Sequence, residues 1–230
     1  MSLRILSYNI HRCIGIDDKY MPERIGRIIV DLDPDVVALQ EVQTFHEGAD
    51  DLLVYFNNNT SYRIILGKTM SFDDSSYGNV MLIKANHCNY TQRTANISVR
   101  GREPRSLIDL EFEWNKKQIS CIGTHLGLKP FERRIQTRKI LEYISKKEKQ
   151  DVILLCGDIN EWFLWGRPLR WLHKHFKRSF SPATFPTSFP ILSLDRIWGI
   201  PSDAIKKVHV HKNSVTRVAS DHYPIFADLV

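Results

Sequence analysis

The sequence predicts a layered α/β protein in which helices cover β-sheets. Short runs rich in Val, Ile, Leu and Phe recur along the chain, each bounded by turn residues, and such runs are typical of strands. Two longer segments between them repeat apolar residues at helical spacing. Strands and helices mixed in this way pack in layers around a core, and 230 residues are enough for one large core. We therefore predict a single domain spanning residues 1–230.

The predicted strands are spread over the whole chain, at residues 3–8, 35–39, 62–66, 80–83, 106–112, 118–123, 152–156, 195–198, 207–210 and 224–229. The predicted helices are residues 22–32, 49–56, 132–147 and 168–176. The first begins at Pro22, which suits a first helical turn, and ends before Asp33-Pro34. In the third, we expect Ile135, Leu141 and Ile144 to face inward and many basic residues to face outward.

The charge balance favours an anionic partner. The chain has 32 Lys and Arg residues against 26 Asp and Glu, a net charge of +6 and a pI near 9.1. Its 43% hydrophobic and 25% charged residues are average for globular proteins, which excludes disorder, collagen and coiled coil.

No apolar run approaches the ~20 residues of a membrane-spanning helix, and no Cys pair has zinc-site or redox-motif spacing. Since a strand is predicted already at residue 3, we expect a cytoplasmic protein without a signal peptide.

Polar residues follow apolar segments at successive predicted strand ends. They are Asn9, Gln40-Glu41, Thr124-His125, Gly157-Asp158-Ile159-Asn160 and, after the apolar segment 216–219, which is also predicted as a strand, Ser220-Asp221-His222. Taken singly, each has an ordinary structural interpretation, such as a turn, a cap or a solvated loop carboxylate. However, side chains at the ends of neighbouring strands are free to converge on a ligand. The occurrence of these motifs in order within one chain therefore predicts one site.

The residue types at these positions fit metal-assisted displacement at phosphorus. Mg²⁺ takes oxygen ligands, and Glu41 is the best ligand candidate, since no Cys or His cluster indicates zinc. Asp158 is predicted to orient or deprotonate the attacking water, with Asn160 holding phosphate or water beside it. The site must also neutralise the charge of an anionic phosphodiester.

Basic side chains are predicted to supply that neutralisation. His125 and His222 are of the right type to donate hydrogen bonds to phosphoryl oxygens, and Asp195 is a candidate partner that orients a charged histidine. Arg105 has two interpretations, a clamp on a phosphate oxygen or an ordinary surface ion pair. Both remain open at the level of sequence.

The motifs, in this order, resemble the endonuclease/exonuclease/phosphatase superfamily, from Ser7-Tyr8-Asn9-Ile10-His11 to the terminal Ser-Asp-His. It includes deoxyribonuclease I, abasic-site endonucleases, neutral sphingomyelinases, inositol-polyphosphate 5-phosphatases and deadenylases. The resemblance implies a four-layer α/β/β/α sandwich, with two central mixed β-sheets packed face to face and the site along one edge. It also implies that Asn9 and Glu41 hold a divalent metal, Mg²⁺ or else Mn²⁺, with Asp221 close to it.

The resemblance further implies that Asp158 and Asn160 engage water and phosphate, and that Asp195 pairs with His222. Departures from particular branches bear on the substrate. Abasic-site endonucleases lack the Thr-His-Leu motif, so His125-Leu126 argues for another branch. The chain looks most like small bacterial members, and both nucleic acid and phospholipid remain open as substrates.

One segment, residues 161–190, combines basic and aromatic side chains. Its basic residues are Arg167, Arg170, Lys174, Lys177 and Arg178, and Glu161 is its only acid. Its aromatic residues include Trp162, Trp165 and Trp171. Three interpretations remain open: an ordinary helix and loop, a nucleic-acid rim in which aromatics stack on bases, or a lipid interface.

We therefore predict a Mg²⁺-dependent phosphodiesterase that acts on nucleic acid or a phospholipid-type substrate. No obligate protein partner or transmembrane segment is evident, although peripheral membrane contact is compatible with the sequence. The alternative hypothesis is an inactive family member that binds nucleic acid or a membrane surface through residues 161–190.

Overall fold

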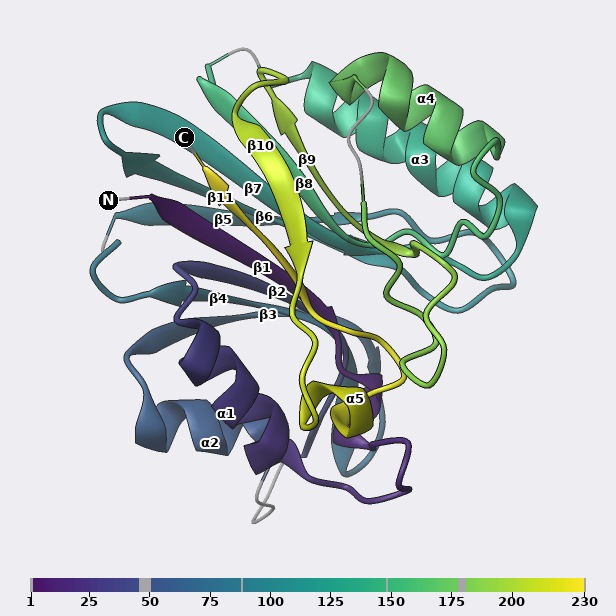
Figure 1. The fold of residues 1–230 in the computed structure, drawn as a ribbon. Coiled ribbons are helices and arrows are strands. Elements are labelled where there is room, and N and C mark those ends of the chain that lie inside the picture. Colours follow the sequence, from purple (N-terminus) through teal and green to yellow (C-terminus); the bar gives the residue numbers. More distant parts are fainter. Residues whose placement is uncertain (1, 46–50, 88, 148, 178–180, 230) are drawn as a thin grey trace.

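Two β-sheets pack face to face, with helices on their outer faces (Figure 1). The computed structural model describes residues 2–45, 51–87, 89–147, 149–177 and 181–229. The six-stranded sheet has the spatial order β10 (Ile205–Val210), β11 (Ile225–Leu229), β1 (Leu3–Asn9), β2 (Val36–Phe45), β4 (Ser75–Lys84) and β3 (Tyr62–Ser71). The five-stranded sheet has the order β5 (Tyr90–Asn96), β6 (Ser106–Trp114), β7 (Lys117–His125), β8 (Val152–Asp158) and β9 (Asp195–Ile200).

Both sheets are mixed, and each contains one parallel pair. Strands β1 and β2 are parallel, as are β7 and β8, whereas the other paired strands are antiparallel. In this register Asn9 lies beside Gln40, and His125 lies beside Asp158. Parallel strands bring their carboxyl ends to the same edge, so His125 and Asp158 meet at the ends of β7 and β8. Asn9 of the facing sheet reaches Asp158 because the two sheets pack together.

Helices complete the outer layers. Helices α1 (Pro22–Leu32) and α2 (Leu52–Asn59) cover the six-stranded sheet, and α3 (Pro130–Ser145) and α4 (Arg167–Phe176) cover the five-stranded sheet (Figure 1). Separate apolar clusters fill the three interfaces, between the sheets, under α1 and α2, and under α3 and α4. The predicted four-layer α/β/β/α sandwich is confirmed.

Two elements differ from the sequence-based expectation. Strand β5 was not predicted, because this edge strand is mostly exposed and polar and has no apolar alternation to reveal it. The apolar segment before Ser220 is a short helix, α5 (Thr216–Ala219), so the prediction of a strand there was wrong. Ser220 itself is extended, which still carries the following residues toward the sheet edge.

The buried face of α3 is more polar than predicted. Ile144 is buried, but Ile135 is only partly buried, and Gln136 and Thr137 are fully buried in its place. Arg133 also points inward, toward the loop that follows β8, rather than outward with the other basic residues.

The remaining helix predictions shift by a few residues. Helix α2 begins at Leu52, because the Asp51 side chain caps it by accepting hydrogen bonds from the backbone of Leu53 and Val54. The predicted start at residue 49 lies outside the described residues. No helix in the described ranges is long and apolar enough to cross a membrane.

Candidate active site

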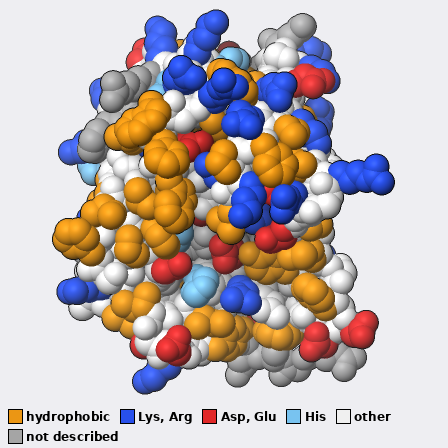
Figure 2. All heavy atoms as spheres, turned by 90° about the vertical axis from the view of Figure 1, so that its right-hand side faces the viewer, with side chains coloured by type: hydrophobic (Ala, Val, Ile, Leu, Met, Phe, Trp, Pro, Cys, Tyr) orange, Lys and Arg blue, Asp and Glu red, His pale blue; other side chains and the backbone are white. Residues whose placement is uncertain are grey.

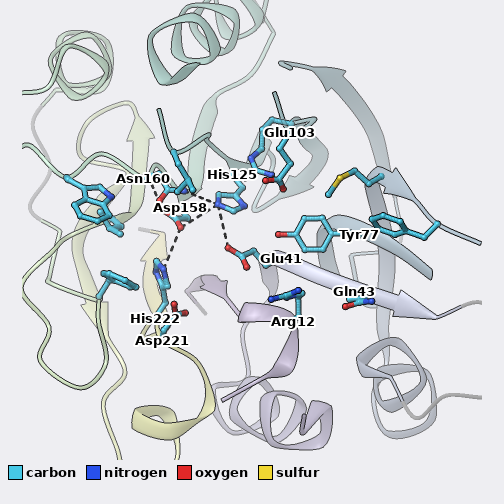
Figure 3. A pocket seen from close by; sticks show the side chains of 17 residues that line it. Arg12, Glu41, Gln43, Tyr77, Glu103, His125, Asp158, Asn160, Asp221 and His222 are labelled. Carbon is cyan, nitrogen blue, oxygen red and sulfur yellow. Dashed lines mark hydrogen bonds and ion pairs between the residues drawn. The ribbon is translucent and has the colours of Figure 1, made fainter. Parts of the chain in front are cut away.

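A cavity of about 540 Å³ opens at the sheet edge where β1, β2, β7 and β8 bring their polar residues together. Figure 2 shows a hollow with acidic and histidine side chains at its floor and hydrophobic side chains around it. Its lining includes the predicted residues Glu41, Arg105, His125, Asp158, Asn160, Asp221 and His222 (Figure 3). Asn9 and Asp195 lie behind this lining and are hydrogen bonded to it.

Glu41 reaches the cavity because β2 contains a bulge. The predicted strand end at Leu39 was wrong, since β2 continues to Phe45. Its pairing with β4 shifts register between Leu39 and Val42, and Glu41 has a φ of 59°. Such a bulge redirects a side chain without ending the strand. The carboxylate therefore points across the edge toward β1 and β8 (Figure 3).

Asn9 joins two carboxylates that are far apart in sequence. Its Nδ2 donates hydrogen bonds to Oε1 of Glu41 at 3.0 Å and to Oδ2 of Asp158 at 3.1 Å. Its Oδ1 accepts from the backbone N–H of His11 at 3.1 Å, and the Ser220 hydroxyl donates to its backbone carbonyl at 2.8 Å. In this arrangement Asn9 orients the two carboxylates through its amide nitrogen.

The site contains a buried histidine–aspartate pair. Nδ1 of His222 lies 2.8 Å from Oδ2 of Asp195, which also accepts a hydrogen bond from the Thr184 hydroxyl at 2.5 Å. The Phe185 ring lies 4.8 Å from the imidazole, centroid to centroid. Burial alone would lower the pKa of His222, but the charges of Asp195 and Asp158 outweigh it and raise the pKa to about 10.

His125 has the opposite protonation state. Burial, together with the charges of Arg105 and His222, holds its pKa well below 6.5. Nδ2 of Asn160 donates to the Leu126 carbonyl at 2.9 Å and lies 3.0 Å from Nε2 of His125. Because that carbonyl fixes which end of the amide is the donor, Nε2 accepts and His125 is neutral.

Asp158 lies between the two imidazoles. Its Oδ2 is 3.7 Å from Nε2 of His125 and 3.8 Å from Nε2 of His222. Burial raises the pKa of this carboxyl to about 6, although the charge of His222 partly opposes the shift. A carboxyl with this pKa accepts a proton in the neutral pH range, which is the property a general base requires.

The Gly-Asp-Ile-Asn motif has a steric basis. Gly157 has a φ of 144°, and a Cβ atom there would lie 1.9 Å from the Thr124 carbonyl oxygen, so only glycine fits against β7. Asn160 also has a left-handed backbone, with a φ of 53°, and its N–H donates to Oδ1 of Asp158 at 2.8 Å. The motif thus places Asp158 and Asn160 on the cavity wall.

Oxygen atoms dominate the part of the cavity suited to a metal ion. Asn9 holds Glu41 and Asp158 close together, and partly exposed Asp221 lines the same cavity. This donor set fits a hard divalent cation such as Mg²⁺. Asp158, Asp195 and His222 also lie within metal-binding distance of one another, but Asp195 is already engaged by His222 and Thr184.

The sequence did not single out several cavity residues, among them Arg12, Tyr77 and Glu103. Arg12 belongs to η1 (His11–Cys13), whose residues all have positive φ, and this conformation has no clear sequence signal. Tyr77 and Glu103 line the same side, and Glu103 forms an ion pair with buried Arg105. Arg105 therefore makes an ion pair, but it is buried rather than an ordinary surface residue, and it lines the cavity. The clamp on a phosphate oxygen stays a prediction.

A sequence profile of the Endonuclease/Exonuclease/phosphatase family matches residues 6–222. The chain belongs to this family. It is also 29% identical to the Escherichia coli protein YbhP, whose name carries the description uncharacterized, over 99% of this chain and 96% of that one.

Solved structures of family proteins share the fold. A mannosyl-6-phosphatase of Bacteroides thetaiotaomicron has a TM-score of 0.78 at 17% identity, with all of both chains covered. The D. rerio protein TDP2, in complex with a single-strand DNA product, has a TM-score of 0.73 at 16% identity, covering 100% of this chain and 99% of that one.

The pKa of His222 predicts how stability depends on pH. In metal-free protein, the free energy of unfolding is expected to fall as the pH rises from about 6.5 to about 10. The pKa of His222 is higher in the folded protein than in the unfolded chain, so the charged imidazole stabilises the fold. This stabilisation is complete at a pH below the unfolded pKa and is lost as the pH rises through the folded pKa. Urea denaturation in EDTA at several pH values measures the slope. Asp195→Asn should flatten it, and an equally steep slope in that variant would contradict the assignment.

Proposed function

We propose that this protein is a Mg²⁺-dependent phosphodiesterase, with Mn²⁺ as an alternative metal. The observation that carries the proposal is the placement of Asp158 between a neutral and a charged imidazole, beside Glu41. This arrangement offers oxygen ligands, a proton acceptor and a cationic hydrogen-bond donor within one cavity. The family membership supports the general class of phosphoester hydrolase.

We assign the metal to Glu41, with Asp221 and Asn9 as further candidates. Nδ2 of Asn9 faces Glu41 and Asp158, whereas its Oδ1 accepts from the His11 N–H, so in the present orientation Asn9 positions Glu41. The bound cation would polarise the phosphoryl group and offset its negative charge.

We assign proton transfer and charge stabilisation to the chain itself. Asp158 would orient the attacking water and take its proton, and Asn160 would hold water or phosphate next to it. Nδ1 of His222 is committed to Asp195, which leaves Nε2 to donate to a phosphoryl oxygen. Asp195 is thus a positioning residue that keeps His222 charged. Neutral His125, whose Nε2 accepts from Asn160, would hold that amide in place without adding charge.

Arginine side chains would hold the flanking phosphate oxygens. Arg105 is buried against Glu103 and lines the cavity, and Arg12 lines it next to Glu41 (Figure 3). Guanidinium groups suit phosphate recognition because they present paired donors in one plane. Of the solved structures named above, one is a mannosyl-6-phosphatase and the other, TDP2, holds a single-strand DNA product. A phosphate ester is the chemistry that the two share.

The activity is tested with the purified protein and a generic diester, bis-p-nitrophenyl phosphate. We expect hydrolysis that requires Mg²⁺ or Mn²⁺, stops in EDTA and exceeds hydrolysis of the monoester p-nitrophenyl phosphate. Faster hydrolysis of the monoester would replace the diesterase assignment by a phosphatase. No turnover of any phosphate ester would favour the alternative function, a binding module that uses residues 161–190.

We further propose a cytoplasmic location, because the cysteines that the structure describes are buried free thiols.

A further inference from the structure

Four consecutive apolar side chains stand in solvent directly beside the cavity. They follow Asn160 and Glu161 along the chain and are Trp162, Phe163, Leu164 and Trp165, with 53%, 54%, 66% and 72% of their surface exposed. Trp162 also lines the cavity. Large apolar residues exposed singly are common, but four in succession at the mouth of a site are not expected without a partner.

Other exposed apolar residues belong to two loops that contribute Leu128 and Phe185 to the cavity lining. Leu128, in the loop after β7, is 64% exposed and lines the cavity. Phe189 and Ile191 are 72% and 63% exposed and lie in the loop closed by the bridge between Phe185 and Leu192. Together with residues 162–165 they form what we call the apolar rim. Figure 2 shows hydrophobic side chains on this face, next to the hollow.

The run at 162–165 is held in place by polar contacts beneath it. The buried carboxylate of Glu161 accepts hydrogen bonds from Arg133 at 3.2 Å and from the Phe163 N–H at 3.3 Å. The Gly166 N–H donates to the Phe163 carbonyl at 2.8 Å, which closes a turn, and the Phe163 and Trp165 rings lie 5.7 Å apart. The polar groups are therefore satisfied inside, while the apolar side chains are directed outward.

Basic residues lie behind the apolar rim. Helix α4 begins at Arg167 and exposes Arg170 and Lys174, and Lys177 follows it. In the described part of this segment the only acid, Glu161, is already paired with Arg133. Figure 2 shows Lys and Arg side chains gathered most densely at the top of this face. Arg178 and Phe180, which the sequence also placed in this segment, lie outside the described residues.

The geometry points to a docking surface for an anionic phospholipid bilayer, with the apolar rim inserted among the headgroups and the cations of α4 on lipid phosphates. Trp and Phe side chains partition to this interface, and nearby Lys and Arg add attraction to anionic lipid. A nucleic-acid rim would interleave cations with stacking aromatic rings. Here Leu128, Leu164 and Ile191 have no ring to stack, and the run 162–165 itself contains no cation.

Docking in this way would bring the cavity to the membrane surface. If the proposed phosphodiesterase activity holds, the substrate class is then a phosphate ester in a lipid headgroup. That last step rests on the proposed function, whereas membrane binding does not depend on turnover.

Binding is tested by co-sedimentation with sucrose-loaded vesicles of phosphatidylcholine alone or with phosphatidylglycerol. We expect binding to the anionic vesicles that weakens with salt, and a blue shift of tryptophan fluorescence. The triple variant Phe163→Ser/Leu164→Ser/Trp165→Ser should bind at least about tenfold less. The matched control is Val30→Ser/Val54→Ser, which removes exposed apolar side chains of α1 and α2 on the opposite outer layer.

Several results would overturn the inference. The first is wild-type protein that sediments with anionic vesicles no more than it does without vesicles. The second is a triple variant that binds the vesicles as well as the wild type. The third is a control variant that loses as much binding as the triple variant. If the wild type binds single-stranded oligonucleotides but not vesicles, and the triple variant no longer binds the oligonucleotides, the surface is assigned to nucleic acid. A dimer that the triple variant dissociates would assign it to a second copy of the chain. A Glu41→Gln variant that still binds vesicles would separate docking from catalysis, so failure of the phosphodiesterase proposal is recognised independently.

Discussion

Glu41→Gln is expected to reduce metal-dependent hydrolysis of bis-p-nitrophenyl phosphate by about 10³-fold or more. The substitution keeps the volume and one oxygen atom of the side chain but removes the charge that attracts the cation. It also leaves Asn9 with an amide in place of the carboxylate that accepts its Nδ2 hydrogen bond. The loss should appear mainly in kcat/KM measured over a range of Mg²⁺ concentrations.

The matched control is Glu113→Gln, an identical chemical change at an exposed position of β6. It should retain the wild-type rate. A thermal unfolding series gives a second readout, because Mg²⁺ stabilises a chain that binds it. Mg²⁺ should raise the Tm of wild type and Glu113→Gln but have little effect on Glu41→Gln. Wild-type turnover by Glu41→Gln would exclude Glu41 as the metal ligand.

The sequence predicted many of the residues that meet in the cavity, because several of them lie at the ends of strands. In a parallel pair the last residues of both strands reach one edge, so the pairing of β7 and β8 places His125 beside Asp158. Asn9 belongs to the other sheet and reaches Asp158 because the two sheets pack face to face. Their motifs also indicated the family, whose fold is the one observed. Glu41 was predicted for the right site but for the wrong reason, since a bulge inside β2 directs it there. A bulge depends on the pairing with β4, which local sequence does not encode.

Other parts of the site depend on three-dimensional packing and left no local pattern. Arg12 reaches the cavity from a left-handed turn that residue type does not favour. The contrasting protonation of His125 and His222 follows from their neighbours, since one is buried near Arg105 and the other is paired with Asp195. The inward orientation of Arg133 was equally hidden, because at the surface of a helix an arginine ordinarily faces water.

Arg133→Met is expected to destabilise the protein by about 3–5 kcal/mol. The guanidinium of Arg133 and the carboxylate of Glu161 are nearly inaccessible to water and meet through two contacts of 3.2 Å. The same arginine donates to the Leu128 carbonyl. Its removal would therefore leave a buried carboxylate without its cation and release two loops that border the cavity. Urea denaturation at neutral pH measures the change.

The double variant Arg133→Met/Glu161→Leu distinguishes the cost of the unpaired charge from the loss of packing. Because neither charge is then buried, we expect it to recover most of the stability that Arg133→Met loses. The control is Arg27→Met, which breaks the ion pair with Glu23 on the exposed face of α1 and should cost less than about 1 kcal/mol. Equal costs for Arg27→Met and Arg133→Met would show that burial of the Arg133–Glu161 pair has no energetic consequence. If the double variant is instead as unstable as Arg133→Met, the hydrogen bonds to Leu128 and Phe163, rather than the charge, hold the two loops at the cavity mouth.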